Sequence, residues 1–268
     1  MTLTETEIER AAEELFSADG NRSQIGLLTI RHPGMTLDDA YAVQSALVRR
    51  KLATGRKVIG WKIGLTSKAM QSALNIDIPD SGVLLDDMAF ENGATVPAGR
   101  FIQPRIEAEI AFVMKAPLAG EDVTREDVVA ATDYVAPSLE ILDTRILRTD
   151  PETGQTRKIG DTISDNAANA GIVLGKERHA IDAFDLRWIG AIVSRNGEVE
   201  ETGLGAGVLN DPVTGIVWLA KRMAIYGQKI EAGQVILSGS FIRPVECPSG
   251  SRIHADFGPF GTVSCDFA

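Results

Sequence analysis

The sequence predicts an α+β fold in which a helical N-terminal region, residues 1–79, leads into a mainly β body, residues 80–268. Apolar residues recur at helical spacing early in the chain. From about residue 80, short apolar runs alternate with Gly, Pro, Asp and Asn, which is typical of strands joined by turns. The 268 residues, of which 44% are hydrophobic, suffice for one large domain or one domain plus a small one.

The first helix is expected over residues 3–17, and a short further helix is expected after Thr66 or Ser67. The apolar face of the first helix consists of Ile8, Ala11, Ala12 and Leu15.

A stronger helix is expected between Thr36 and Gly55. Thr36 can cap its first turn, Asp38 and Asp39 suit the positive end of the helix dipole, and Gly55 ends it. Its buried stripe is predicted to contain Leu37, Ala40, Tyr41, Leu47, Val48 and Leu52.

The β body contains one clear hairpin and one long helix. The segment "IGAIVSRNGEVEE" alternates apolar and polar residues around Asn196-Gly197, a dipeptide that favours a two-residue hairpin turn. The segment "DPVTGIVWLAKRMAIYG" predicts a helix capped by Asp211, with Pro212 in the first position and Gly227 at its end.

Charge and composition exclude several classes of partner. The net charge of −10 and the pI of about 4.9 argue against nucleic acid and against an anionic membrane surface, since both require a basic face. No apolar run is long enough to cross a membrane, and the acidic N-terminus does not resemble a signal peptide. Two cysteines, Cys247 and Cys265, form no metal motif or disulfide framework, so we expect a cytoplasmic protein.

The stretch "PRIEAEIAF" places two glutamates in an apolar run. On a strand, Glu107 and Glu109 share one face, while Ile106, Ala108 and Ile110 form the other. The two carboxylates would stand ~6.6 Å apart and repel by ~2.5 kcal/mol at an effective dielectric of about 20. From this spacing alone a solvent-facing strand is the simpler interpretation; the alternative is a hard cation that both residues bind.

A third acid favours the cation. Glu140 lies between Leu139 and Ile141 in "DYVAPSLEILDT", and a buried glutamate needs a partner. Three carboxylates without a neighbouring histidine define an oxygen-only site, which suits Mg²⁺ or Mn²⁺ and not zinc. The three histidines of the chain are scattered and receive no role.

Lys62 lies in the apolar segment "VIGWKIGLTS", between Gly60 and Gly64. Its stem can pack while its amine reaches water, or it can serve as a cation or acid/base in a catalytic site. Asp80 follows Pro79 in "IPDSGVLLDDM", where an aspartate is most often a turn former. By itself Asp80 is a weak signal.

Seven long motifs resemble the 2-oxo-4-pentenoate hydratase and 4-oxalocrotonate decarboxylase family of the fumarylacetoacetate hydrolase superfamily, from about residue 20 to the C-terminus. They are "GWKIGLTSKAMQ", "PDSGVLLDDM", "PRIEAEIAFV", "SLEILDTRI", "DTISDNAANAGIVLG", "NGEVEETGLGAGVLNDPVTGIVWLA" and "AGQVILSGSFIRPV". The resemblance implies a mixed β-sandwich roll with a small helical N-terminal region, and a homo-oligomer.

The resemblance also implies roles for particular residues. Glu107, Glu109 and Glu140 fall on the positions of the Mg²⁺ or Mn²⁺ ligands, and Lys62 and Asp80 match positions that handle protons. Ser164 and Ser240 are expected to line the pocket of a small 2-oxo acid substrate.

Within the family, "DPETGQTRKIGDTISDNAANAG" together with "GSFIRPV" is most similar to the hydratases that act on a seven-carbon 2-oxo-4-ene diacid in homoprotocatechuate breakdown. Decarboxylation of a 4-oxalocrotonate-type acid is the alternative. A C–C bond hydrolase ranks third, since no histidine and acid pair is evident, and an accessory non-enzymatic role is also conceivable. For the distal carboxylate of the substrate, Arg243, Arg157 and Lys158 are candidates and none stands out.

Overall fold

The computed structural model describes residues 2–68, 71–72, 76 and 78–268 and has the α+β architecture expected from the sequence. Its larger sheet has the strand order β2-β1-β10-β5-β6-β7-β3, with β11 paired to one end of β5. The strands are β1 (Val58–Gly64), β2 (Asp80–Leu85), β3 (Ala89–Phe90), β5 (Arg105–Met114), β6 (Thr132–Leu142), β7 (Asn169–Leu174), β10 (Val235–Leu237) and β11 (Val245–Glu246).

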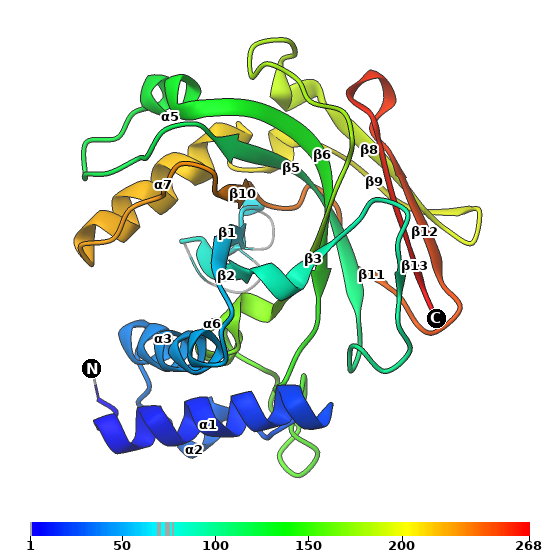
Figure 1. Cartoon of the computed structure of the whole chain (residues 1–268). Helices are drawn as coiled ribbons and strands as arrows, with labels where there is room; N and C mark the ends of the chain where they lie inside the picture. The colour runs from blue at the N-terminus through cyan, green and yellow to red at the C-terminus, as the bar shows by residue number, and fades with distance from the viewer. Residues whose placement is uncertain (1, 69–70, 73–75, 77) are drawn as a thin grey trace.

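The smaller sheet has the order β4-β13-β12-β8-β9 and packs against the apolar face of the larger one (Figure 1). Its strands are β4 (Thr95–Val96), β8 (Gly190–Arg195), β9 (Glu198–Leu204), β12 (Arg252–Asp256) and β13 (Thr262–Phe267). The hairpin predicted at Asn196-Gly197 is confirmed as β8 and β9, and both turn residues have positive φ. Ile106, Ile110 and Phe112 of β5 are completely buried in the core between the layers.

Six α-helices in the described part of the chain fall into two groups (Figure 1). They are α1 (Glu5–Asn21), α2 (Leu28–Arg31), α3 (Leu37–Ala53), α5 (Arg125–Ala131), α6 (Ile159–Ser164) and α7 (Pro212–Ile225). The first three lie together at one end of the molecule with α6, which packs against α3, and α5 and α7 contact each other beside the larger sheet. The short helix expected after Thr66 or Ser67 falls largely among residues outside the described part of the chain.

The helix caps follow the sequence. Thr36 and Asp39 form a reciprocal capping box at the start of α3. Asp211 caps α7, with Pro212 in the first position, as predicted. The first helix begins later and ends later than expected, because Thr4 and Glu7 form a capping box that starts α1 at Glu5 and the helix then continues to Asn21.

The predicted stripe of α3 needs one correction. Leu52 is exposed rather than buried, whereas Gln44 is buried. The Gln44 side-chain amide donates to the carbonyls of Ser81 in β2 and Ile163 in α6, at 2.8 and 3.0 Å. Gln44 therefore lies within the buried stripe of α3, and its two hydrogen bonds attach the helical region to the β body.

Two helices of the β body, α5 and α6, were not predicted, since each is too short to show a helical period. The division of the chain at residue 80 stays a prediction, and β1, from the N-terminal side of it, is a strand of the larger sheet. In the described ranges no helix is both long and apolar enough to span a bilayer.

Candidate active site

Residues from four strands share one face of the larger sheet. Lys62 on β1 pairs with Gly82 of β2 and with Leu237 of β10. Leu237 in turn pairs with Ala111 of β5. Because paired residues lie on the same face, and residues two apart on a strand do so as well, the face that carries Lys62 also carries Asp80, Glu107 and Glu109. Glu107 is paired directly with Glu140 of β6, which adds the third glutamate.

The three glutamates converge. One carboxylate oxygen from each of Glu107, Glu109 and Glu140 lies within 4.8 Å of the others. Glu109 and Glu140 are 0% exposed, which rules out the solvent-facing strand. At this separation two carboxylates repel by at least ~3.5 kcal/mol at an effective dielectric of about 20, so the arrangement needs protons or a cation to offset its charge.

Lys62 lies beside this cluster and is only 4% exposed. Its Nζ lies 3.4 Å from Oε1 of Glu140 and donates to the carbonyl of Ala167 at 3.1 Å. The side chain therefore does not reach water, which excludes the interpretation that only its stem packs. Gly64 leaves room for this arrangement, because a Cβ there would lie 2.2 Å from the Asp80 carboxylate and 3.0 Å from Nζ of Lys62.

Asp80 is not a simple turn former. It begins β2 opposite Gly64 and is 2% exposed. Burial raises the pKa of its carboxyl, while Lys62 and a hydrogen bond from the Gly64 backbone lower it. Asp80 and Lys62 thus form an acid and a cation that are close together and removed from solvent.

The charges of the cluster shift its proton affinities. Burial raises the pKa of Glu107 to about 7 and that of Glu109 to about 8, although Lys62 acts in the opposite direction on both. The pKa of Glu140 is raised well above its usual value, first by burial. Burial alone would lower the pKa of Lys62, but the attraction of Glu140, Asp80 and the other two glutamates outweighs it and raises that pKa.

Backbone groups fix one of the glutamates. The N–H of Gly239 donates to Oε2 of Glu109 at 2.7 Å. Gly239 has φ +116°, a conformation that residues with a side chain rarely adopt, and a Cβ there would lie 2.3 Å from Oγ1 of Thr66. A glycine is therefore required where the chain passes between Glu109 and Thr66.

The donor set fits a hard divalent cation. Among the residues that the structure describes, Oε1 of Glu109 and both carboxylate oxygens of Glu140 are buried without a hydrogen-bond partner. Buried orphan acceptors of this kind are costly unless another group binds them. Three carboxylates without nitrogen or sulfur ligands suit Mg²⁺ or Mn²⁺, and leave positions open for water and substrate.

The two predicted serines, Ser164 and Ser240, form hydrogen bonds with backbone groups and not with the glutamates. Ser164 is buried at the end of α6, and its hydroxyl donates to the Gly160 carbonyl at 2.8 Å. Ser240 follows Gly239, and its hydroxyl donates to the carbonyl of Ile242 at 2.9 Å. Both hydroxyls are thus engaged with backbone groups, and a role in substrate binding stays a prediction for each.

The candidate cations for a distal carboxylate are dispersed. Arg243 is 82% exposed and forms an ion pair with Glu201 at 2.7 Å. Arg157 lies against the carbonyl of Ile146, and the backbone N–H of Lys158 donates to Asp161 at the start of α6. No contact that the structure describes joins any of the three to the glutamate cluster.

Comparison with known proteins gives the class of this fold and site. A fumarylacetoacetate hydrolase family protein from Yersinia pestis CO92 has the same fold, with a TM-score of 0.57, 14% identity and coverage of 78% of this chain and 92% of that one. The 4-oxalocrotonate decarboxylase of Pseudomonas putida G7, solved with magnesium and adipate, superposes with a TM-score of 0.93 and 36% identity over 100% of this chain and 99% of that one.

The 2-oxo-hept-4-ene-1,7-dioate hydratase of Escherichia coli is 53% identical over 96% of both chains. No family model matches the chain. The chain therefore belongs to the family of 2-oxo-4-pentenoate hydratases and 4-oxalocrotonate decarboxylases.

The sequence did not indicate two backbone contributors to the site. The Ala167 carbonyl and the Gly239 N–H carry no side-chain signature, so only the fold shows that they bind Lys62 and Glu109. The glycines on either side of Lys62 signal a close approach to the backbone, but the groups that approach there are Val235 and Asp80.

Changing Glu107 to Gln is expected to weaken Mg²⁺ binding at least about tenfold, since it removes one ligand charge and ~1.4 kcal/mol corresponds to each factor of ten. Titration calorimetry of metal-free protein measures this. Glu198→Gln, on the exposed hairpin, is the matched control and should bind as the unaltered protein does. Equal affinity in the Glu107 and Glu198 variants would remove Glu107 from the ligand set.

The metal-free protein should lose stability as pH rises through 7 to 8. Its glutamates bind protons more tightly when folded than when unfolded, so their stabilising contribution is complete below about pH 4.5 and disappears above the folded pKa values of about 7 and about 8. Between about pH 5.5 and about pH 8.5 we expect the Tm to fall by at least roughly 5 °C, because the two groups together lose more than ~2 kcal/mol of stabilisation and ~1 kcal/mol shifts the Tm of a domain this large by about 2–4 °C.

Thermal scans with and without saturating Mg²⁺ test this dependence. The cation should make the Tm less dependent on pH, because it offsets the carboxylate charge. Glu109→Gln should reduce the same dependence without metal. If the Tm depends on pH in the same way for the metal-free protein, the protein with Mg²⁺ and the Glu109→Gln variant, the cluster does not titrate in this range.

Proposed function

We propose that this protein is a metal-dependent hydratase, a hydro-lyase that adds water to 2-oxohept-4-ene-1,7-dioate or a close 2-oxo-4-enoate to give the 4-hydroxy-2-oxo acid. The observation that carries the proposal is the cluster of the half-buried Glu107 with the buried Glu109 and Glu140, which faces Lys62 and Asp80. The choice of substrate rests on the 53% identity to the Escherichia coli hydratase named for this compound.

The cation of the proposal is Mg²⁺ or Mn²⁺, held by Glu107, Glu109 and Glu140. The decarboxylase from Pseudomonas putida G7 was solved with magnesium and with calcium, which supports a divalent ion in this family. When bound, such an ion would polarise the 2-oxo group of the substrate and offset negative charge that develops on its oxygen. The open positions of a three-carboxylate site leave room for the substrate carboxylate and 2-oxo oxygen.

Lys62 and Asp80 are the proposed proton carriers. A proton must leave C3 and another must reach C5, so that the double bond becomes conjugated with the ketone and C4 becomes open to attack by water. Hydroxide then adds to C4 and a proton returns to C3, which balances the addition. Asp80 can hold a proton because burial raises its pKa, and Lys62 can donate one from its ammonium.

The attraction of the glutamates for the Lys62 proton is part of the mechanism. These carboxylates raise the pKa of Lys62 as long as their charge is uncompensated. Offsetting that charge at the metal site would bring the pKa of Lys62 back down, toward the range where its proton can move. The net charge of the glutamate cluster thereby sets the pKa of the Lys62 ammonium beside it.

The second candidate is decarboxylation of a 4-oxalocrotonate-type acid, favoured by the 0.93 TM-score to the Pseudomonas putida G7 decarboxylase. Both reactions begin from a bound 2-oxo acid, so the ligand set does not separate them. The hydratase is preferred because the identity is 53% to the hydratase and 36% to that decarboxylase, each over nearly the whole chain.

The proposal extends to the setting of the enzyme. We place it in the catabolism of aromatic compounds, in homoprotocatechuate breakdown, as a cytoplasmic homo-oligomer. The two cysteines, buried and unpaired, are compatible with a reducing compartment. Ser164 and Ser240 are retained as proposed substrate contacts.

Product analysis by mass decides between the two reactions. Purified protein with Mg²⁺ should add one water to 2-oxohept-4-ene-1,7-dioate and release little carbon dioxide from 4-oxalocrotonate. The same protein stripped of metal by a chelator is the control and should do neither. Efficient release of carbon dioxide, with no hydrated seven-carbon product, would replace the hydratase by the decarboxylase.

Changing Lys62 to Met should lower kcat at least about 100-fold, because it keeps the stem and removes the proton carrier. Lys57→Met provides the matched control, since Lys57 is exposed just before β1. Steady-state hydration rates are compared at saturating Mg²⁺. Activity of the Lys62 variant within a few-fold of the control would make Lys62 a packing residue.

A further inference from the structure

An unusual turn follows α6, within the motif "SDNAANAG". Asn166, Ala167 and Ala168 are three successive residues in the left-handed region, with φ of 52°, 53° and 61°. None of them is glycine; asparagine adopts this region more readily than other residues, but the two alanines are held in a conformation that their side chains disfavour. Such a turn persists only where the surrounding structure fixes it, and strain of this kind is concentrated at functional sites.

The side chain of Asn166 fixes the turn to β2. Its Oδ1 accepts from the N–H of Val83 at 2.8 Å, and its Nδ2 donates to the carbonyl of Val83 at 2.9 Å. Both backbone groups of one residue are thus bound by one amide. The turn lies so close to β2 that a Cβ at Gly82 would be 2.5 Å from the Asn166 carbonyl. Asn166 therefore sets the distance between the turn and the strand that begins with Asp80.

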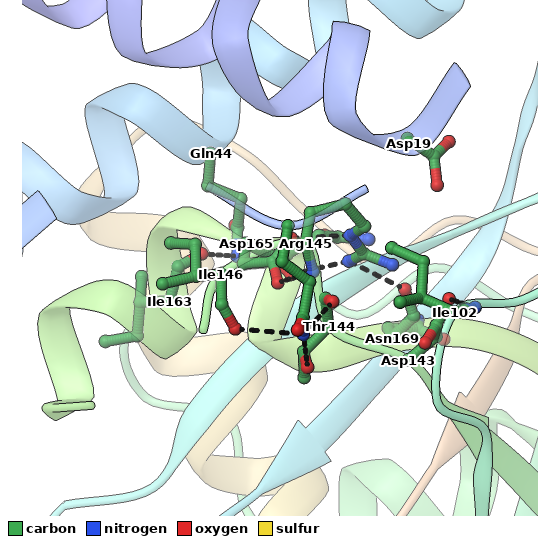
Figure 2. A network of polar contacts seen from close by, with 12 residues as sticks. Asp19, Gln44, Ile102, Asp143, Thr144, Arg145, Ile146, Ile163, Asp165 and Asn169 are labelled. Atoms are coloured by element: carbon green, nitrogen blue, oxygen red, sulfur yellow. Dashed lines mark hydrogen bonds and ion pairs between the residues drawn. The ribbon is translucent and has the colours of Figure 1, made fainter. Parts of the chain in front are cut away.

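Arg145 joins the two ends of the turn (Figure 2). Its Nη2 donates to the carbonyl of Asp165 at 2.8 Å and to that of Asn169 at 3.3 Å. Its Nε and its backbone N–H each bind one oxygen of the Asp165 carboxylate, at 2.6 and 2.7 Å. Arg145 is 3% exposed and Asp165 is 0% exposed, so this ion pair is screened little by solvent.

The middle residue of the turn reaches the site. The carbonyl of Ala167 accepts from Nζ of Lys62 at 3.1 Å, while Glu140 lies on the ammonium at 3.4 Å. Lys62 is thus held between a neutral acceptor supplied by the turn and a carboxylate of the glutamate cluster. If the turn relaxed to an ordinary conformation, the Ala167 carbonyl would rotate away and only the carboxylates would hold the ammonium.

We propose that Asn166 and Arg145 are positioning residues for Lys62. They hold the left-handed turn so that the Ala167 carbonyl keeps the ammonium in its place above the substrate site, and neither residue touches the reacting atoms. The inference rests on the proposed function in one respect, namely that Lys62 handles a proton of the substrate.

The test compares two changes at Asn166. Asn166→Ala removes the bonds to Val83 and keeps the backbone strain. Asn166→Gly removes the same bonds but accepts a left-handed φ freely, so it should fold and melt at a higher temperature than the Ala variant. We expect both to lose kcat about tenfold or more, with KM and Mg²⁺ affinity changed less than about threefold.

Asn196→Ala is the matched control. Asn196 also has a left-handed φ of 56°, and its side chain accepts from the backbone N–H of Arg252 at 2.9 Å, but it lies in the β8–β9 hairpin. It should lower the Tm and leave kcat unchanged. An Asn166→Gly variant with kcat within about twofold of the unaltered protein would overturn the proposal, as would a loss of Mg²⁺ affinity as large as the loss of kcat.

A second readout needs no turnover. The rate at which an amine-acylating reagent labels Lys62, followed by mass spectrometry of peptides, should rise several-fold in Asn166→Gly and stay constant in Asn196→Ala. An unchanged rate in Asn166→Gly would refute the positioning role. If the unaltered protein neither hydrates 2-oxohept-4-ene-1,7-dioate nor decarboxylates 4-oxalocrotonate, the proposed function is refuted. The labelling result would still decide the role of Asn166.

Discussion

Repulsion between buried carboxylates is the constraint on which the rest of this structure depends. Glu107, Glu109 and Glu140 project from adjacent strands onto one face, Asp80 shares that face, and Lys62 is the cation placed among them. Each close pair of carboxylates opposes folding by ~3.5 kcal/mol at an effective dielectric of about 20, against a total stability of about 5–15 kcal/mol for a typical domain. The fold can hold this group only with protons or a cation bound. Burial raises the pKa of all three glutamates, and repulsion from neighbouring glutamates raises those of Glu109 and Glu140 further.

The structure meets this constraint with backbone groups rather than with further charged side chains. The Gly239 N–H binds Glu109, and the Ala167 carbonyl binds Lys62. Peptide dipoles stabilise charge without adding a titratable group, and they are fixed in direction by the fold. The remaining carboxylate oxygens on Glu109 and Glu140 keep no hydrogen-bond partner in the described part of the chain, and so stay available as ligands.

Local patterns predicted the parts of this site but not their assembly. A period of two placed Glu107 and Glu109 on one face, and an apolar context singled out Glu140 and Lys62. The pairing of Glu107 with Glu140 and the route from Lys62 through β10 to β5 depend on a strand order that does not follow the sequence. The same limit explains the error in α3, where Gln44 is buried and Leu52 is exposed, because the partners of Gln44 lie 37 and 119 residues away.

The N-terminal helices carry none of the proposed catalytic groups, yet they determine where two of those groups stand. Gln44 of α3 binds the Ser81 carbonyl, and the Tyr41 hydroxyl accepts from the Ser81 N–H at 3.2 Å, so α3 holds β2 directly beside Asp80. Gln44 also binds α6, from which the left-handed turn departs toward Lys62. The left-handed alanines of that turn, Ala167 and Ala168, cost of order 1–3 kcal/mol each, and a turn on the surface, with fewer contacts to fix it, would relax. The N-terminal helices cover that turn and keep it in the interior. Helix packing thereby stabilises the position of Lys62, although Lys62 lies on a strand of the sheet and not on a helix.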